Sequence, residues 1–164
     1  ILGYPIIGND DELPKLREQF NLALVSVGQI KNAGVRKSLF KKLKDLGFKL
    51  PLIISKKAYV SSHAKLSDGI IVMHNVVINA GAQIGHNCII NTKSIVEHDV
   101  RIGDHCHIAT GSIVNGDAEV GNETFIGSGS VVREGIRIGQ RSFIAAGTRV
   151  MKDLPPNSNF RNRL

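Results

Sequence analysis

The sequence predicts a mainly β protein, a parallel β-helix preceded by a small α/β lobe. Every sixth residue from Val60 to Val150 is aliphatic, without exception over sixteen positions. Four residues after each of these, as far as Thr148, stands a second column of small or β-branched residues. A helix face repeats at 3.6 residues and a strand face at 2, so a strict period of six indicates a solenoid of hexapeptide repeats.

Three hexapeptides are expected to complete one triangular coil, with the large aliphatic residue inside and the smaller residue where the chain bends. Successive coils should rise by about 4.8 Å, the spacing of hydrogen-bonded strands. Residues 58–154 then form a prism of about five coils and roughly 24 Å, and residues 155–164 form a C-terminal tail. Cys88 and Cys106 both fall in the small-residue column, which predicts buried free thiols.

Residues 1–57 are expected to form a small lobe of the βαβ type. The acidic residues before a proline predict a short helix over residues 12–19, and apolar runs at residues 22–27 and 50–54 predict buried strands. Between these strands an apolar stripe at helical spacing predicts a second helix; its members are Val35, Leu39, Leu43 and Leu46. The ends of the strands in such a unit are the usual place for a ligand.

The chain carries a net charge of +7, most of it in the lobe. Residues 1–57 hold eleven Lys and Arg against five Asp and Glu. This excess indicates either a solvated helix face or a patch that attracts a phosphorylated ligand. Aromatic residues make up only 5% of the chain, which argues against nucleic acid as a partner. No apolar run approaches the ~18 residues that span a bilayer, and no signal peptide is visible, so a cytoplasmic location is expected.

Three histidines follow an interior aliphatic residue by two positions: His74, His86 and His98. Successive members are twelve residues apart, so in a coil of three hexapeptides they point from different faces and form no single cluster. His98 differs because it lies between Glu97 and Asp99. A carboxylate beside an imidazole fixes its tautomer and raises its basicity, so Asp99 is the expected partner of His98, with Glu97 as the substitute.

The sequence resembles the hexapeptide-repeat acetyltransferases of bacterial sugars, of the sialic acid O-acetyltransferase and nucleotide-amino-sugar N-acetyltransferase type. The matching segments are Ser26-Val-Gly28, Gly47-Phe48, Asn91-Thr-Lys-Ser-Ile-Val-Glu-His98-Asp99, Ile102-Gly-Asp104 and His107-Ile. The resemblance implies a left-handed β-helix, a homotrimer with active sites between chains, and a lobe that binds a sugar nucleotide. Family members begin with a strand and a Gly-rich loop that this sequence lacks, which indicates a truncated lobe.

The resemblance also implies roles for individual residues. His98 is expected to be the general base, and the backbone of Gly116 to lie beside the thioester and its oxyanion. The acetyl-CoA track is expected to pass His107, Gly116, Ser128 and Ala146. Gly28 and Asn91 match positions that line the acceptor pocket. If His98 is not the base, His107 is the next candidate.

The expected function is acetyl-CoA-dependent transfer of an acetyl group to the amine of a nucleotide-linked amino sugar of the UDP-4-amino-sugar type. Transfer is direct and needs no metal. O-acetylation of sialic acid or a related sugar is the alternative, because an amine and a hydroxyl need the same base. Two other classes stay open: a zinc enzyme of the γ-carbonic anhydrase type, with His98, His105 and His107 as ligands, and a purely structural solenoid. Binding of acetyl-CoA would separate the transferase from both.

Overall fold

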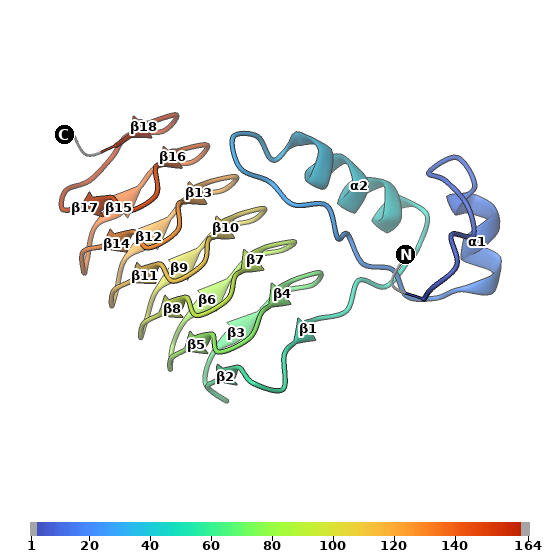
Figure 1. The fold of residues 1–164 in the computed structure, drawn as a ribbon, viewed down its shortest axis with the longest axis horizontal. Coiled ribbons are helices and arrows are strands. Elements are labelled where there is room, and N and C mark those ends of the chain that lie inside the picture. The colour runs from blue at the N-terminus through green and yellow to red at the C-terminus, as the bar shows by residue number, and fades with distance from the viewer. Residues whose placement is uncertain (1–2, 162–164) are drawn as a thin grey trace.

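The protein is a stack of triangular coils with two helices beside it (Figure 1). The computed structural model describes residues 3–161. Within them eighteen strands of two residues each form three parallel sheets. Neither helix in this part of the chain is long and apolar enough to cross a membrane.

Each sheet forms one side of the prism. The seven-stranded sheet contains β1 (Ile53–Ile54), β4 (Ile71–Val72), β7 (Ile89–Ile90), β10 (His107–Ile108), β13 (Phe125–Ile126), β16 (Phe143–Ile144) and β18 (Asn159–Phe160). The six-stranded sheet contains β2 (Tyr59–Val60), β5 (Val77–Ile78), β8 (Ile95–Val96), β11 (Ile113–Val114), β14 (Val131–Val132) and β17 (Arg149–Val150). The five-stranded sheet contains β3 (Lys65–Leu66), β6 (Gln83–Ile84), β9 (Arg101–Ile102), β12 (Glu119–Val120) and β15 (Arg137–Ile138).

The strand register confirms the period read from the sequence. Ile95 pairs with Ile113, and Val96 with Val114, so each residue stacks on the residue eighteen positions further along. From Ile70 to Val150 the residues of both sequence columns are at most 3% exposed. The two columns therefore fill the interior of the prism, as predicted, and Cys88 and Cys106 are buried free thiols within it.

The chain turns at three corners in every coil, which we name by the sheets they join. The 6/5 corner follows β8, the 5/7 corner follows β9, and the 7/6 corner follows β7. From Gly69 to Gly147, the third residue after each interior aliphatic has a positive φ. Glycine tolerates this backbone well, and Asn and Asp adopt it more readily than most other residues.

The lobe differs from the expected βαβ unit. Both helices are present, as α1 (Leu13–Gln19) and α2 (Gly34–Asp45). The strand expected at residues 22–27 is reduced to a single parallel bridge between Leu22 and Lys49. Of the strand expected at residues 50–54, only β1 forms, and it pairs with β4 of the prism. The expected βαβ unit is therefore reduced to the Leu22–Lys49 bridge, because the rest of both segments has other partners: β1 pairs with the prism, and the carbonyls of Val25 and Val27 accept hydrogen bonds from Arg36.

Strand pairing extends the prism at both ends. The prism begins at Ile53, because β1 pairs with β4, and it reaches Phe160, because β18 pairs with β16. The coil is therefore longer than the expected range of residues 58–154, and part of the expected tail continues it. The lobe boundary at residue 57 stays a prediction.

Candidate active site

A cavity of about 510 Å³ lies at the 6/5 corner, around the Glu-His-Asp segment. Glu97 and His98 come from the coil of β8, Asn115 and Gly116 from the next coil, and Glu134 from the coil after that. Because residues eighteen apart stack, three successive coils contribute the wall. Asp117 and Gly135 complete the lining.

His98 is held by Asp99. The ring Nδ1 donates a hydrogen bond to Asp99 Oδ2 at 3.0 Å, because a carboxylate oxygen can only accept. This hydrogen bond to Asp99, helped by the charges of Asp99, Glu97 and Asp117, raises the pKa of His98 above its ordinary value. Nδ1 therefore carries a proton, and in the neutral ring Nε2 is left as an acceptor. The side chain is 65% exposed, so a substrate can reach it.

Glu97 has a different partner. Its Oε2 accepts a hydrogen bond from Asn79 Nδ2 at 2.7 Å, one coil earlier. Of the two carboxylates considered as the orienting group, Asp99 is the one in contact with the imidazole. Glu97 contributes its charge and part of the cavity wall.

Gly116 lies directly against the Nε2 edge of the His98 ring. A Cβ atom at residue 116 would come within 2.6 Å of His98 Nε2. The backbone N–H of Gly116 makes no hydrogen bond within residues 3–161. A small group beside Nε2 could therefore meet an unobstructed imidazole nitrogen and a free backbone donor.

His107 and Asn91 form a second constellation on the seven-stranded sheet. His107 Nδ1 donates to the carbonyl of Gln29 at 2.6 Å, and Asn91 Nδ2 donates to His107 Nε2 at 3.2 Å. Burial lowers the pKa of His107, and the hydrogen bond to Gln29 only partly offsets this. The ring is therefore neutral at neutral pH, and with both nitrogens occupied it is a poorer candidate base than His98.

The remaining predicted cofactor and acceptor residues lie on the same side as His107. Ser128 and Ala146 stack at the 7/6 corner, where the amide of Gly147 donates to the carbonyl of Ser128 at 2.8 Å. Gly28 is exposed, precedes Gln29, and has open space where a side chain would be.

One chain thus holds the predicted residues of the prism in two groups. Glu97, His98, Asp99 and Gly116 lie at the 6/5 corner. Asn91, His107, Ser128 and Ala146 lie on the seven-stranded sheet and at the 7/6 corner. The whole width of the six-stranded sheet separates the two groups.

A buried arginine that we did not single out in the sequence joins the lobe to the prism. Arg36 of α2 is 1% exposed. Its guanidinium donates to the carbonyls of Asn87, Val25 and Val27, and burial lowers its pKa to about 10. Gln29 adds a hydrogen bond from its side chain to the carbonyl of His105. These contacts hold the loop that carries Gly28 and Gln29 against the prism.

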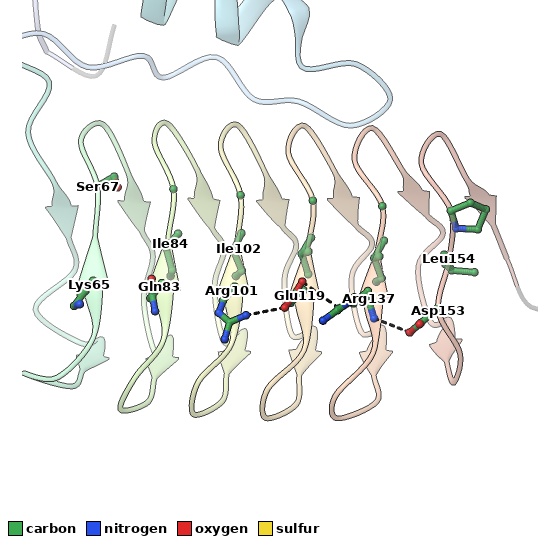
Figure 2. Close-up of a pocket in the computed structure, with 17 residues that line it drawn as sticks. Lys65, Ser67, Gln83, Ile84, Arg101, Ile102, Glu119, Arg137, Asp153 and Leu154 are labelled. Atoms are coloured by element: carbon green, nitrogen blue, oxygen red, sulfur yellow. Dashed lines mark hydrogen bonds and ion pairs between the residues drawn. The ribbon is translucent and has the colours of Figure 1, made fainter.

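A groove of about 950 Å³ follows the five-stranded sheet. Figure 2 shows Lys65, Gln83, Arg101, Glu119 and Arg137 in a row along it. Arg101 and Arg137 both pair with Glu119, at 2.7 and 3.4 Å. None of the predicted site residues lines this groove.

The described residues contain no group of three or more His, Cys, Asp or Glu side chains placed to hold a metal ion. Three histidines were considered as zinc ligands. His105 lies at the 5/7 corner, and His107 lies in β10, the strand that follows this corner. His98 lies at the 6/5 corner.

The prism of hexapeptide coils places the chain among the bacterial transferases. A family model described as bacterial transferase hexapeptide (six repeats) matches residues 81–116 and 117–152. We found no match among curated protein sequences.

Comparison with solved structures identifies the kind of transferase more closely. A histidine-to-asparagine variant of perosamine N-acetyltransferase from Caulobacter crescentus, in complex with CoA and GDP-perosamine, is 38% identical with a TM-score of 0.91. The match covers 95% of this chain and 73% of that one. The acetyltransferase domain of PglB from Neisseria gonorrhoeae, in complex with acetyl coenzyme A, is 30% identical with a TM-score of 0.90, over 96% of this chain and 75% of that chain. The chain belongs to the hexapeptide-repeat sugar acetyltransferases of the left-handed β-helix type.

Proposed function

We propose that the protein transfers the acetyl group of acetyl-CoA to the amine of a nucleotide-linked amino sugar, with His98 as the general base. The observation that carries the proposal is the His98–Asp99 pair beside Gly116, in a chain 38% identical to a GDP-perosamine-bound N-acetyltransferase. Because acetyl-CoA is the donor, we place the reaction in the cytoplasm.

In this mechanism the amine nitrogen attacks the thioester carbonyl, and His98 Nε2 accepts the proton that the nitrogen loses. The carbonyl oxygen becomes an oxyanion, which the free N–H of Gly116 stabilises. Collapse of the tetrahedral intermediate forms the amide bond and breaks the bond from carbon to sulfur. The proton then passes from the imidazolium to the leaving thiolate, so the histidine returns to its neutral form. Asp99 stabilises the imidazolium between these two steps.

A homotrimer would bring the two groups of predicted residues together. The 6/5 corner of one protomer would meet the 7/6 corner and seven-stranded sheet of its neighbour. The outward residues of the six-stranded sheet favour this packing, because Val77, Ile95, Ile113 and Val131 form a β-branched, partly exposed face between the two corners. Flat apolar strands of this kind pack well against another copy.

The acceptor would approach through the lobe of the neighbouring protomer. In this arrangement Gly28 and Asn91 would line the acceptor pocket between the two protomers, on the side formed by His107. His107, Ser128 and Ala146 would line the acetyl-CoA track. An acceptor linked to UDP remains our prediction, whereas the Caulobacter enzyme was solved with GDP-perosamine.

The test is a screen of GDP- and UDP-linked amino sugars with acetyl-CoA, read by the mass gain of one acetyl group. Sialic acid belongs in the same screen as the O-acetyl acceptor. His98→Ala should lower turnover by roughly 10²- to 10⁴-fold, the usual contribution of a positioned general base. His86→Ala is the matched control, because His86 occupies the same place in its own hexapeptide but lies at the 5/7 corner, outside both groups of predicted residues. Failure of every amino sugar, or parental turnover in His98→Ala, would contradict the proposal.

A further inference from the structure

Gly81 lies one coil before Asp99, at the same 6/5 corner. The amide of Asp99 donates to the carbonyl of Ala80 at 3.0 Å, which sets the two coils in register. A Cβ atom on residue 81 would come within 2.1 Å of Asp99 Oδ1 and 3.1 Å of its Cγ. The carboxylate of Asp99 therefore rests in the space that the missing side chain of Gly81 leaves.

The obstructed atom belongs to the end of a short, rotatable side chain. The nearest backbone atom to that Cβ, the amide nitrogen of Asp99, is 3.4 Å away. An alanine at residue 81 would therefore rotate the carboxylate and leave the coil in place. The same carboxylate accepts the hydrogen bond from His98 Nδ1 through Oδ2.

We propose that Gly81 is a positioning residue for the catalytic pair: its lack of a side chain holds the Asp99 carboxylate in the orientation that bonds His98. Gly81 touches neither substrate nor cofactor and acts through Asp99. The inference rests on the proposed role of His98 as the base. Its direct consequence, however, is the geometry of the pair, which can be measured without turnover.

The other charges around His98 do not depend on residue 81. Glu97 is bonded to Asn79, and Asp117 and Glu134 belong to later coils. A substitution at residue 81 therefore changes the contribution of Asp99 alone. Because the Asp99 hydrogen bond is the largest influence that raises the pKa of His98, loss of that bond lowers the pKa.

The experiment compares Gly81→Ala with Gly111→Ala in the full chain. Both glycines have a positive φ, +75° and +66°, so both substitutions carry a similar backbone strain. No atom lies within 4 Å of the added Cβ at residue 111, so this control changes the backbone alone.

The first readout is the pKa of His98, from NMR titration of the imidazole Cε1–H signal, assigned with His98→Ala. Gly81→Ala should lower this pKa, and Gly111→Ala should leave it unchanged. Turnover of Gly81→Ala should fall by about tenfold, a part of the 10²–10⁴ that a positioned base contributes. In an Asp99→Asn background, Gly81→Ala should cause no further loss.

A His98 pKa that is the same in both alanine variants would overturn the inference. So would a further loss of turnover when Gly81→Ala is added to Asp99→Asn. If the pKa falls as expected but His98→Ala keeps parental turnover, Gly81 still positions the pair, and the proposed role of His98 as base fails instead.

Discussion

His98 gains its acid–base character from the residue that follows it. The corner places Asp99 at φ +59°, so its side chain turns back to the imidazole and bonds Nδ1. Nε2 then faces Gly116, where a side chain would block it. In the proposed mechanism, one hydrogen bond and one missing side chain thus define which nitrogen of His98 accepts the proton and from which side.

The pH dependence of turnover should report this pair. Only the neutral imidazole accepts a proton, so the rate should rise with pH through the raised pKa of His98 and then level off. Asp99→Asn removes the carboxylate, so the rise should move to lower pH while the plateau falls by about tenfold. Glu97→Gln should move the rise less, because Glu97 makes no hydrogen bond to His98. Equal shifts in both variants, measured as kcat against pH, would speak against Asp99 as the orienting group.

Part of this site could be predicted from the sequence, because His98 and Asp99 are neighbours in the chain. Asn79 and Gly81 could not be found by the same reasoning, since they act from the preceding coil. The only available signal was the eighteen-residue stacking, which places residue 79 under 97 and residue 81 under 99. Reading the whole repeat in columns of eighteen residues would have found both.

At the scale of elements, the six-residue period predicted the prism well, because every coil buries residues at the same positions of the repeat. The lobe has no repeat, and its strands were inferred from apolar runs alone. Val25 is buried, as the run suggested. Its carbonyl and that of Val27 nevertheless accept hydrogen bonds from Arg36 instead of from a neighbouring strand. Nothing in the sequence indicated that the side chain of Arg36, on the next helix, would donate the hydrogen bonds that a neighbouring strand usually donates.

Arg36 should be essential for docking of the lobe. Arg36→Met keeps most of the side-chain volume but removes three charge-assisted hydrogen bonds, so we expect a loss of stability on the order of 3 kcal/mol. The hydrogen-bonded amides of Ala23 and Lys49 should exchange hydrogen faster, while those of the prism stay protected. Lys37→Met is the control: its ion pair to Glu123 crosses the same junction but is exposed, and such pairs contribute about 0–1 kcal/mol. Equal protection in both variants would show that Arg36 is dispensable.

The contacts of the other lysines of α2 distinguish between the two explanations of the positive charge on the lobe, a solvated helix face and a patch that binds phosphate. Lys41 pairs with Asp45 and Lys44 with Asp68, while Lys42 donates to the carbonyl of Asp10. These contacts favour a solvated helix face over a phosphate site. Attraction of a phosphorylated ligand by this patch stays a prediction.

At the scale of the whole molecule, the proposed trimer depends on the outward face of the six-stranded sheet. Ile113 lies on its outward face, near the middle of the stack. If this face packs between protomers, Ile113→Lys should bury a charge in the interface and yield monomers. Gln83→Lys, on the outward face of the five-stranded sheet, should leave the assembly unchanged. Light scattering measures both, and a trimeric Ile113→Lys would move the interface to another face.

The central claim is that His98 of one protomer works with the His107 side of its neighbour. The most direct measurement is the turnover of mixed trimers, formed by co-expressing His98→Ala and His107→Ala chains with different tags. Each variant alone should be nearly inactive. In a random mixture, a site is intact when the first chain keeps His98 and the second keeps His107, so activity should recover to about a quarter of the parental value. If the mixture is no more active than the two variants measured separately, each site is built within one chain and the account is wrong.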